Sequence, residues 1–262
     1  MTEETSMAEL EIAWLDLEGA SNVRDLGGLP AGTGRTRRGV LLRSDALDAL
    51  TSADVAVLAG VGVAHVVDLR TAAERAERGA GLLRSTGATY SEMEAFDDAV
   101  LARRRQARNA AFAAGVDPIT IMAEGYGELL ELAGPIFTTV LGRLVEPAGV
   151  PVLIHCSAGK DRTGVLVALL LEAAGVERAA VVADYAATQQ RMEGVVARLS
   201  GSDAYQRLAH EIPAFVLEAH PATMEIVLAG IDERWGGAAA YFEAHGAAAA
   251  TIDRWRELLV DR

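Results

Sequence analysis

The chain has 262 residues, of which 51% are hydrophobic and 23% charged, and its formal net charge is −13. This balance excludes intrinsic disorder and low-complexity or collagen-like architectures, and the length suits one domain spanning residues 1–262. An acidic chain lacks the broad basic face that nucleic acids and anionic membranes require, so neither is an expected partner. The single cysteine excludes a disulfide framework and multi-cysteine zinc sites, and we expect no metal or cofactor.

Neither a secretory signal nor a membrane span is indicated. Residues 1–16 are acidic and lack a basic region followed by an apolar core. The longest apolar stretch, Val165 to Val176, contains Glu172 and is too short to cross a bilayer. The sequence therefore predicts a cytoplasmic protein without stable membrane insertion.

The first two thirds of the chain alternate short apolar runs with helical patterns. We expect the first part to begin with turns over 19–45, which include a strand at 39–44, followed by a helix over 52–58 ending at Gly60. A buried strand over 63–70 and a helix over 71–78 come next, and then a polar excursion of helix and loop over 93–118. The last elements are a helix over 126–144 with a kink or break at Pro135, a buried strand over 151–155 and an apolar helix over 163–174. Strands that alternate with helices predict an α/β domain with a central, mainly parallel sheet flanked by helices.

The C-terminal third is rich in helix patterns. We expect helices over 179–198, 205–219, 223–235, 238–245 and 251–259. Within residues 187–219, two amphipathic stretches carry more apolar side chains than a solvated helix pair needs: Met192, Val195, Val196, Leu199, Leu208, Ile212, Phe215, Val216 and Leu217. Either they pack permanently on the core, or they form a helical lid hinged at residues 200–202.

One ten-residue segment, His155 to Gly164, holds both the only cysteine and the only lysine of the chain. Cys156 ends a predicted strand and precedes a turn into a helix, where backbone N–H groups and the helix dipole favour an anion and favour thiolate over thiol. Arg162, six positions later, offers a planar fork that matches two phosphate oxygens. The segment thus predicts a cradle for a tetrahedral dianion above a sulfur nucleophile, which suits phosphoryl transfer.

Two other phosphate-binding motifs do not fit. A nucleotide P-loop requires Ser or Thr after Gly-Lys, but Asp161 follows Lys160, and Ile154 occupies the position of the earlier glycine. Residues 32–37 lack the third glycine of a dinucleotide fingerprint and follow no predicted strand, so we interpret them as a turn.

The pattern His-Cys-x5-Arg-Thr-Gly after a strand resembles the signature of the cysteine-dependent protein tyrosine phosphatases. Its longer form, His-Cys-x-x-Gly-Lys-Asp-Arg-Thr-Gly, resembles a narrower, mycobacterial-type branch of bacterial tyrosine/serine and phosphoinositide phosphatases. The resemblance extends over about residues 18–260, with supporting segments at 21–28, 42–45, 67–70 and 184–185. It implies a metal-independent phosphomonoesterase that hydrolyses phosphotyrosine through a phosphocysteine, with phosphoserine, phosphothreonine and phosphoinositides as further candidate substrates.

The resemblance also implies roles for individual residues. Cys156 corresponds to the nucleophile and Arg162 to the phosphate clamp. Asp161 is the favoured general acid, with Asp97 and Asp98 as alternatives. Residues that would contact substrate or steady the thiolate are Ser157, Ala158, Gly159, Lys160, Thr163 and Gly164.

Other candidates surround the loop. Lys160 would add a second cation beside Arg162 and reach past the transferred phosphate. His155 would order the loop, and Asp68 with Arg70 would form a structural brace. The run Arg103 to Arg105 is either a solvated helix face or a patch that guides phosphoinositides.

Two rivals remain open. A catalytically silent phospho-binding module would keep the fold, but Cys156, Asp161 and Arg162 are all present, which disfavours it. A rhodanese-like sulfurtransferase also places a cysteine in an anion-binding loop. The histidine before Cys156 and the Arg-Thr-Gly after the loop favour the phosphatase.

Overall fold

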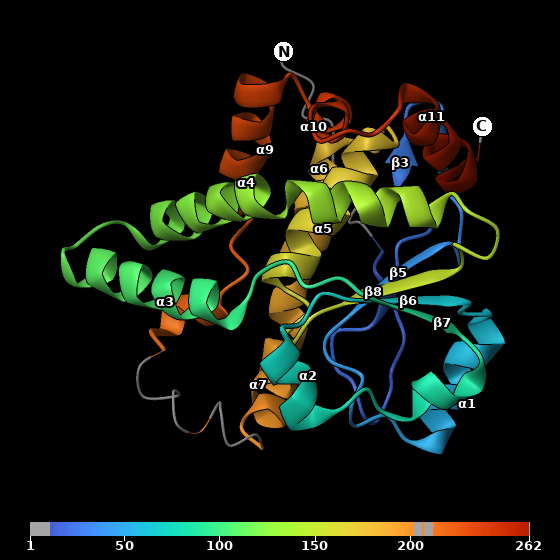
Figure 1. The fold of residues 1–262 in the computed structure, drawn as a ribbon, viewed down its shortest axis with the longest axis horizontal. Helices are drawn as coiled ribbons and strands as arrows, with labels where there is room; N and C mark the ends of the chain where they lie inside the picture. Colours follow the sequence, from blue (N-terminus) through green and yellow to red (C-terminus); the bar gives the residue numbers. More distant parts are fainter. Residues whose placement is uncertain (1–10, 202–205, 207–211, 262) are drawn as a thin grey trace, which may run out of the picture.

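A computed structural model describes residues 11–201, 206 and 212–261 of the chain (Figure 1). Its main sheet has six strands in the order β1 (Ala13–Trp14), β2 (Arg24–Asp25), β5 (Leu41–Ser44), β8 (Val152–His155), β6 (His65–Asp68) and β7 (Thr89–Glu92). The four strands β5, β8, β6 and β7 are parallel, and β1 and β2 pair antiparallel at one edge. The predicted α/β class with a mainly parallel sheet is confirmed.

A small antiparallel sheet joins the two ends of the described chain. It consists of β3 (Pro30–Ala31), β4 (Gly34–Thr36) and β9 (Val260–Asp261). Arg35 pairs in register with Asp261, so the C-terminal strand is held against the N-terminal third. The turn predicted over residues 32–37 is confined to 32–33, between β3 and β4, and residues 34–36 form β4 itself.

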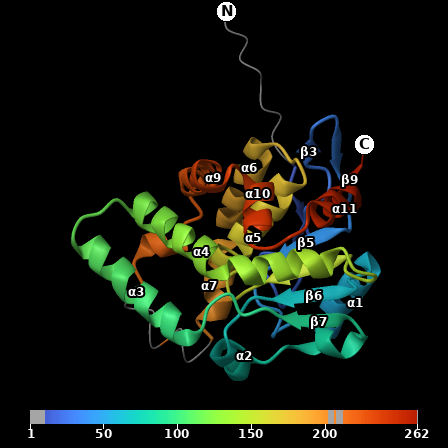
Figure 2. The same ribbon diagram turned by 45° about the horizontal axis from the view of Figure 1, so that its top comes forward.

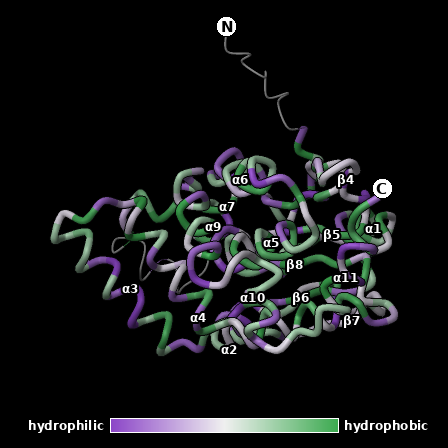
Figure 3. The backbone as a smooth tube through the Cα atoms, turned by 90° about the horizontal axis from the view of Figure 1, so that it is seen from above, coloured by the Kyte–Doolittle hydropathy of each residue, from purple (hydrophilic) through white to green (hydrophobic). Residues whose placement is uncertain are grey.

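The central strands alternate their side chains between two hydrophobic cores. Val152 and Ile154 of β8 face the larger core, beneath α4 (Pro118–Leu144) and α5 (Asp161–Ala173), while Leu153 faces a smaller core with Leu58 of α1 (Ser52–Val61). Figure 1 shows α4 and α5 on one side of the sheet and α1 on the other. Hydrophobic stretches gather along the central strands in Figure 3, as expected for parallel strands buried on both faces.

Helix ends follow local capping chemistry. Thr51 and Asp54 form a capping box at the start of α1, and the helix passes Gly60 to end at Gly62, which adopts φ 83°. The predicted stop at Gly60 is thus wrong, because Gly62 supplies the left-handed C-cap and a glycine inside a helix costs only about 1 kcal/mol. Thr71 and Glu74 cap α2 (Ala72–Arg78) in the same way.

The polar excursion contains one long helix, α3 (Asp98–Ala113), which Asp97 caps. Helix α4 begins at Pro118, earlier than expected, and runs through Pro135 as one continuous element. Together α3 and the first part of α4 project from the body as a helical pair (Figures 1 and 2). This pair stands beside the N-terminal end of α5.

The C-terminal helices are broken more often than predicted. The expected helix over 179–198 is α6 (Arg178–Ala187), a 3-10 turn η2 (Thr188–Arg191) and α7 (Met192–Leu199). The expected helix over 205–219 is wrong at its end, where a short 3-10 helix η4 (Ala214–Leu217) leads into extended backbone at Glu218. Leu208 lies outside the described residues, as do 205, 207 and 209–211 of the same segment.

The remaining helices match the predicted ones closely. They are α9 (Pro221–Trp235), α10 (Ala238–Ala244) and α11 (Ala249–Leu259). They join α4 and α5 in the larger core, through residues such as Leu228, Phe242 and Trp255. Among the described helices, none is long and apolar enough to cross a membrane.

Three charged side chains are buried together beside the sheet. Asp184 of α6 accepts hydrogen bonds from Arg24 Nε (2.7 Å) and from Arg43 Nη1 (2.6 Å), and all three side chains are almost inaccessible. Burial lowers the pKa of Arg24 to about 10, although Asp184 opposes that shift. One carboxylate therefore compensates two buried guanidinium groups.

We expect Asp184→Asn to lower the free energy of unfolding by about 3–5 kcal/mol, because it leaves two buried cations without a counter-charge. The measurement is denaturant unfolding at neutral pH. Asp253→Asn is the matched control, since Asp253 forms an exposed pair with Arg256 at 2.8 Å and its loss should cost less than about 1 kcal/mol. A loss at Asp184 no larger than the control would contradict this account.

Candidate active site

The catalytic loop predicted from the sequence, Cys156 to Lys160, connects the carboxyl end of β8 to the first turn of α5. Cys156 is buried, with 2% of its surface exposed. Gly159 has φ 67°, and a Cβ atom there would lie 2.4 Å from the carbonyl oxygen of Ser44 at the end of β5. Only glycine lets the loop pass this close to the neighbouring strand.

The loop's carbonyl groups are held on the side away from the cavity. Asn22 Nδ2 donates to the carbonyl oxygens of Ala158 (3.2 Å) and Gly159 (3.3 Å), and Arg43 Nη2 donates to that of Gly159 (2.6 Å). No described residue accepts a hydrogen bond from the backbone N–H groups of residues 157–160. Backbone N–H groups without a protein acceptor are available to an anion, so we interpret this arrangement as an anion-binding cradle.

Arg162 contributes one edge of its guanidinium group to the cradle. Its Nη1 donates to Glu74 Oε2 (2.6 Å) and to the carbonyl oxygen of Leu69 (3.2 Å), and its Nη2 donates to Glu74 Oε1 (2.8 Å). The N–H of Nε and the second N–H of Nη2 have no acceptor among the described residues. These two donors lie along the same edge, which matches two oxygens of a phosphate.

Glu74, on α2, is a site residue that the sequence reasoning missed. Its Oε1 also accepts a hydrogen bond from Ser157 Oγ (2.6 Å). Burial alone raises the pKa of the Glu74 carboxyl, but Arg162 and the hydrogen bonds from Arg162 and Ser157 outweigh burial and lower it to about 2. The only sequence signal was the spacing Thr71-x-x-Glu74, which indicates a capping box and nothing about catalysis.

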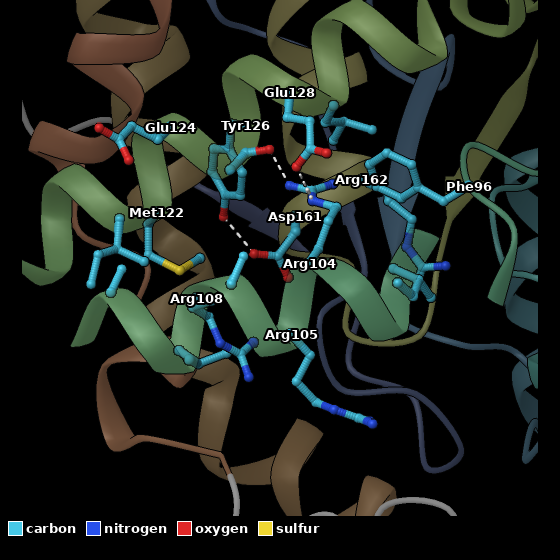
Figure 4. Close-up of a pocket in the computed structure, with 17 residues that line it drawn as sticks. Phe96, Arg104, Arg105, Arg108, Met122, Glu124, Tyr126, Glu128, Asp161 and Arg162 are labelled. Carbon is cyan, nitrogen blue, oxygen red and sulfur yellow. Dashed lines mark hydrogen bonds and ion pairs between the residues drawn. The ribbon is translucent and has the colours of Figure 1, made fainter. Parts of the chain in front are cut away.

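Asp161 lies at the mouth of the cradle, in the first turn of α5. Its Oδ1 accepts a hydrogen bond from the hydroxyl of Tyr126 (2.6 Å) and lies 3.3 Å from Lys160 Nζ; Figure 4 shows the Tyr126 contact. Burial raises the pKa of Asp161, but Lys160, the Tyr126 hydrogen bond and Arg162 together leave it below its usual value. The carboxylate is therefore ionised when no substrate is bound.

The two alternative acids differ in position. Asp98 lines the cavity above Cys156, and its Oδ1 accepts a hydrogen bond from Thr71 Oγ1 (2.5 Å). Asp97 caps α3 by accepting from the N–H of Val100 (2.7 Å) and does not line that cavity. Asp98 remains an alternative to Asp161 on position alone.

Lys160 has partners that the sequence did not suggest. Its side chain is buried, and its Nζ donates to the carbonyl oxygens of Val216 (2.5 Å) and Glu218 (3.0 Å). The only lysine therefore connects the catalytic loop to the η4 segment. Substrate contact by Lys160 stays a prediction.

The proposed brace under the loop is a dense ionic cluster. Arg70 Nε donates to both carboxylate oxygens of Asp68, and Arg70 Nη2 donates to Asp68 Oδ2 at 2.7 Å. On the other side, His155 Nε2 lies 3.7 Å from Asp68 Oδ2. Burial raises the pKa of Asp68, but His155 and Arg70 together lower it to about 2. His155 Nδ1 also lies 3.3 Å from the carbonyl oxygen of Cys156. All three side chains are buried, and their role as a structural brace stays a prediction.

A cavity of about 410 Å³ opens above the loop. Of the predicted site residues, it is lined by Cys156, Ser157, Ala158, Lys160, Asp161 and Arg162. Gly159, Thr163 and Gly164 do not line it. The hydroxyl of Thr163 is buried without a hydrogen-bond partner in the described chain, so it is free to act on the thiolate, and that role stays a prediction.

The opposite wall of this cavity comes from the stretches predicted as a lid. Met192 and Leu199 of α7, together with Ile212, Val216 and Leu217, face the loop across the cavity. Ring centroids of Phe215 and Phe112 lie 4.8 Å apart, which joins η4 to the end of α3. These segments cover the site as both interpretations require, and movement of a lid stays a prediction.

Comparison with known proteins identifies the family of this chain. The model of the tyrosine phosphatase family matches residues 15–261. The triple specificity protein phosphatase PtpB of Mycobacterium tuberculosis is 31% identical, over 94% of this chain and 98% of that protein. A tyrosine-protein phosphatase of Nostoc commune is 29% identical over 81% of this chain and 71% of its own length. A putative tyrosine-protein phosphatase of Cupriavidus necator is 31% identical over 82% of this chain and 78% of its own length.

The family match includes the whole of the loop, the helices around it and every strand of the main sheet except β1. It favours the phosphatase over the rhodanese-like alternative, in agreement with the histidine before Cys156 and the Arg-Thr-Gly that follows the loop. The chain belongs to the tyrosine phosphatase family and is a hydrolase of phosphotyrosine.

Proposed function

We propose that this enzyme transfers the phosphoryl group of its substrate to Cys156 and then to water, without a metal ion. The observation that carries the proposal is the set of N–H groups of residues 157–160 without an acceptor among the described residues, in a loop whose Cys156 lines one cavity with Arg162 and its open edge. Such a cradle stabilises the charge on the phosphoryl oxygens through fixed dipoles and one guanidinium group.

In the first step the Cys156 thiolate attacks phosphorus as the bond from phosphorus to the ester oxygen breaks. The leaving oxygen takes a proton from Asp161, and a phosphocysteine remains. In the second step Asp161 accepts a proton from the attacking water, the P–S bond breaks, and inorganic phosphate and the Cys156 thiolate are released. Arg162 holds two phosphoryl oxygens through both steps.

Asp161 must gain a proton before it can act as the acid. In the free enzyme its pKa lies below the usual value, so the carboxyl is ionised at neutral pH. A phosphate dianion bound beside Arg162 repels the carboxylate and thereby raises its pKa. Protonation of Asp161 is therefore coupled to substrate binding, and we expect an acidic optimum for turnover.

The substrate range beyond phosphotyrosine is also part of the proposal. The relative from Mycobacterium tuberculosis is named a triple specificity phosphatase. This name supports phosphoserine and phosphothreonine as further substrates. Phosphoinositides are further candidates because of the resemblance of the loop, Cys156 to Arg162, to that of phosphoinositide-hydrolysing phosphatases.

The test of the mechanism is Cys156→Ser. We expect less than about one per cent of wild-type turnover of p-nitrophenyl phosphate, because serine is a poor nucleophile at its ordinary pKa. Binding of vanadate or phosphate should persist, because the cradle is intact. Wild-type turnover should survive EDTA. Sensitivity to the chelator, or substantial residual activity in Cys156→Ser, would refute the mechanism, and absence of wild-type turnover would favour the silent binding module.

Asp161→Asn should lower kcat by about 10²–10⁴-fold, most strongly for phenyl phosphates with poor leaving groups. It should also abolish the fall of kcat at high pH, because kcat reports the pKa of the acid in the substrate complex. Tyr126→Phe should retain that fall but move it to higher pH, because the carboxylate loses a hydrogen bond and its pKa rises. If Asp161→Asn leaves the leaving-group dependence unchanged, the acid is another residue, with Asp98 the next candidate.

Glu74→Gln should reduce kcat/KM by about tenfold to a hundredfold, the equivalent of one or two charge-assisted hydrogen bonds. Glutamine offers a single acceptor oxygen, so one nitrogen of Arg162 loses its partner and the guanidinium group is no longer fixed. Glu131→Gln, which removes an exposed pair with Arg234, is the control and should leave kcat/KM unchanged. Equal kinetics in both variants would show that Arg162 needs no positioning by Glu74.

A further inference from the structure

A second cavity of about 330 Å³ adjoins the catalytic cavity on the side of α3 and α4. The two cavities share the wall residues Leu101, Arg105, Asp161, Arg162 and Val216. A substrate held at Cys156 can therefore extend into the second cavity without leaving the protein surface. Figure 4 shows this cavity with the residues that line it.

Most of its wall is apolar or aromatic. The apolar and aromatic side chains come from the helical pair, the segment before it and η4: Phe96, Leu101, Ala107, Ala111, Ile121, Met122, Tyr126, Leu129 and Val216. This lining suits the hydrocarbon part of a ligand. The charged groups on the same wall determine which polar group this ligand carries beside its hydrocarbon part.

Two of the arginines on this wall already have partners. Arg104 packs over the ring of Phe96 at 4.3 Å, pairs with Glu128 Oε2 at 3.1 Å and donates to the carbonyl oxygen of Gly125. Arg105 also interacts within the protein. Neither is a free anion-binding group.

Arg108 is different. It lies on α3 one turn beyond Arg104 and lines the second cavity (Figure 4). Its Nε donates to Asn109 Oδ1 (3.2 Å), but its Nη2 is buried and has no hydrogen-bond partner among the described residues. Burial, together with Arg105 and Arg104, lowers the pKa of Arg108, while Asp161 opposes that shift. A buried guanidinium nitrogen without an acceptor is costly, and an incoming anion would relieve the cost.

The charge of the wall favours one anionic group over several. Glu124, Glu128 and Asp161 line the same cavity, so a ligand with multiple phosphates would meet three carboxylates. Apart from Arg162, which faces the phosphotyrosine, Arg108 is the one guanidinium group of this wall with an unpaired buried nitrogen among the described residues. A single carboxylate on an aliphatic stem fits both the apolar wall and Arg108. That is the chemistry of a glutamate side chain in a peptide.

We infer that this cavity is a specificity subsite, in which Arg108 binds an acidic side chain adjacent to the phosphotyrosine of a phosphopeptide. The inference rests on the proposed function, because it places the phosphotyrosine at Cys156. The enzyme carries a net charge of −13, so its overall field repels acidic peptides. A preference for such peptides must then come from a local group.

The experiment compares two phosphotyrosine peptides that differ only in the residues on both sides of the phosphotyrosine, glutamate in one and glutamine in the other. The wild type should favour the glutamate peptide by about tenfold in kcat/KM, and Arg108→Gln should abolish this preference while retaining turnover of the glutamine peptide. Arg108→Lys keeps the charge without the planar fork and should keep part of the preference. Arg103→Gln is the control, since Arg103 is exposed on the same helix and pairs with Glu128 at 3.7 Å.

The same peptides can be tested by binding alone. Their Kd values for Cys156→Ser, with and without Arg108→Gln, report on the subsite even if turnover fails, so failure of the mechanism and failure of the subsite are distinguishable. No preference in the wild type, or a preference that survives Arg108→Gln, would overturn the inference. So would an Arg108→Gln defect confined to the soluble headgroup of a phosphoinositide, which would assign the cavity to a different ligand.

Discussion

Asn22 and Arg43 donate hydrogen bonds to the carbonyl groups of Ala158 and Gly159, and the proposed anion cradle depends on these bonds. A tight turn exposes both backbone N–H groups and carbonyl oxygens, but a phosphate dianion binds only the N–H groups, because its oxygens accept hydrogen bonds. Once the carbonyl oxygens are bound from behind, the N–H groups of the loop can face the cavity. The buried guanidinium of Arg43 is in turn neutralised by Asp184, so the geometry of the loop traces back to a charge pair on α6.

The same logic of compensation recurs around the site. A phosphatase needs positive charge for its dianionic substrate, yet uncompensated cations are costly in a protein interior before substrate arrives. Here Glu74 accepts hydrogen bonds along one edge of the Arg162 guanidinium group and leaves the other edge open, while Asp161 forms an ion pair with Lys160. The acidic composition of the chain is thus consistent with a small cationic site, because carboxylates fix the cations and leave specific donors unpaired.

The sequence predicted well those features that depend on contiguous residues. The strand over 151–155, the loop and the helix that follows needed only local periodicity, a glycine and the spacing from Cys156 to Arg162. Glu74 could not be found in this way. It lies 88 residues before Arg162, and its spacing from Thr71 is fully explained by a helix cap. The partners of Lys160 escaped notice for the same reason, because backbone carbonyls of a distant segment leave no trace in residue identity.

Helix boundaries were the other source of error. Gly60 lies inside a helix because the packing of α1 outweighs the local preference of one residue. The stretch after Gly201 shows the opposite effect: its apolar spacing predicted a helix to Ala219, yet the end of the segment turns into a 3-10 helix and extended backbone. There the carbonyls of Val216 and Glu218 bind Lys160 instead of continuing a helical ladder. The kink expected at Pro135, which lies inside α4, stays a prediction.

The concentration of rare residues in the loop gives the protein two built-in chemical reporters. Cys156 is its only thiol, and Lys160 supplies its only side-chain amine. The rate of labelling by a thiol reagent therefore reports the exposure of the Cys156 sulfur. The rate of labelling by an amine reagent, once reaction at the N-terminus is subtracted, reports the exposure of Lys160 Nζ, which donates to the carbonyl groups of Val216 and Glu218. Both labelling rates are measured on the unmodified chain, at the opposite ends of one loop. Their ratio separates opening of the segment over the site from access to the sulfur, with no engineered probe.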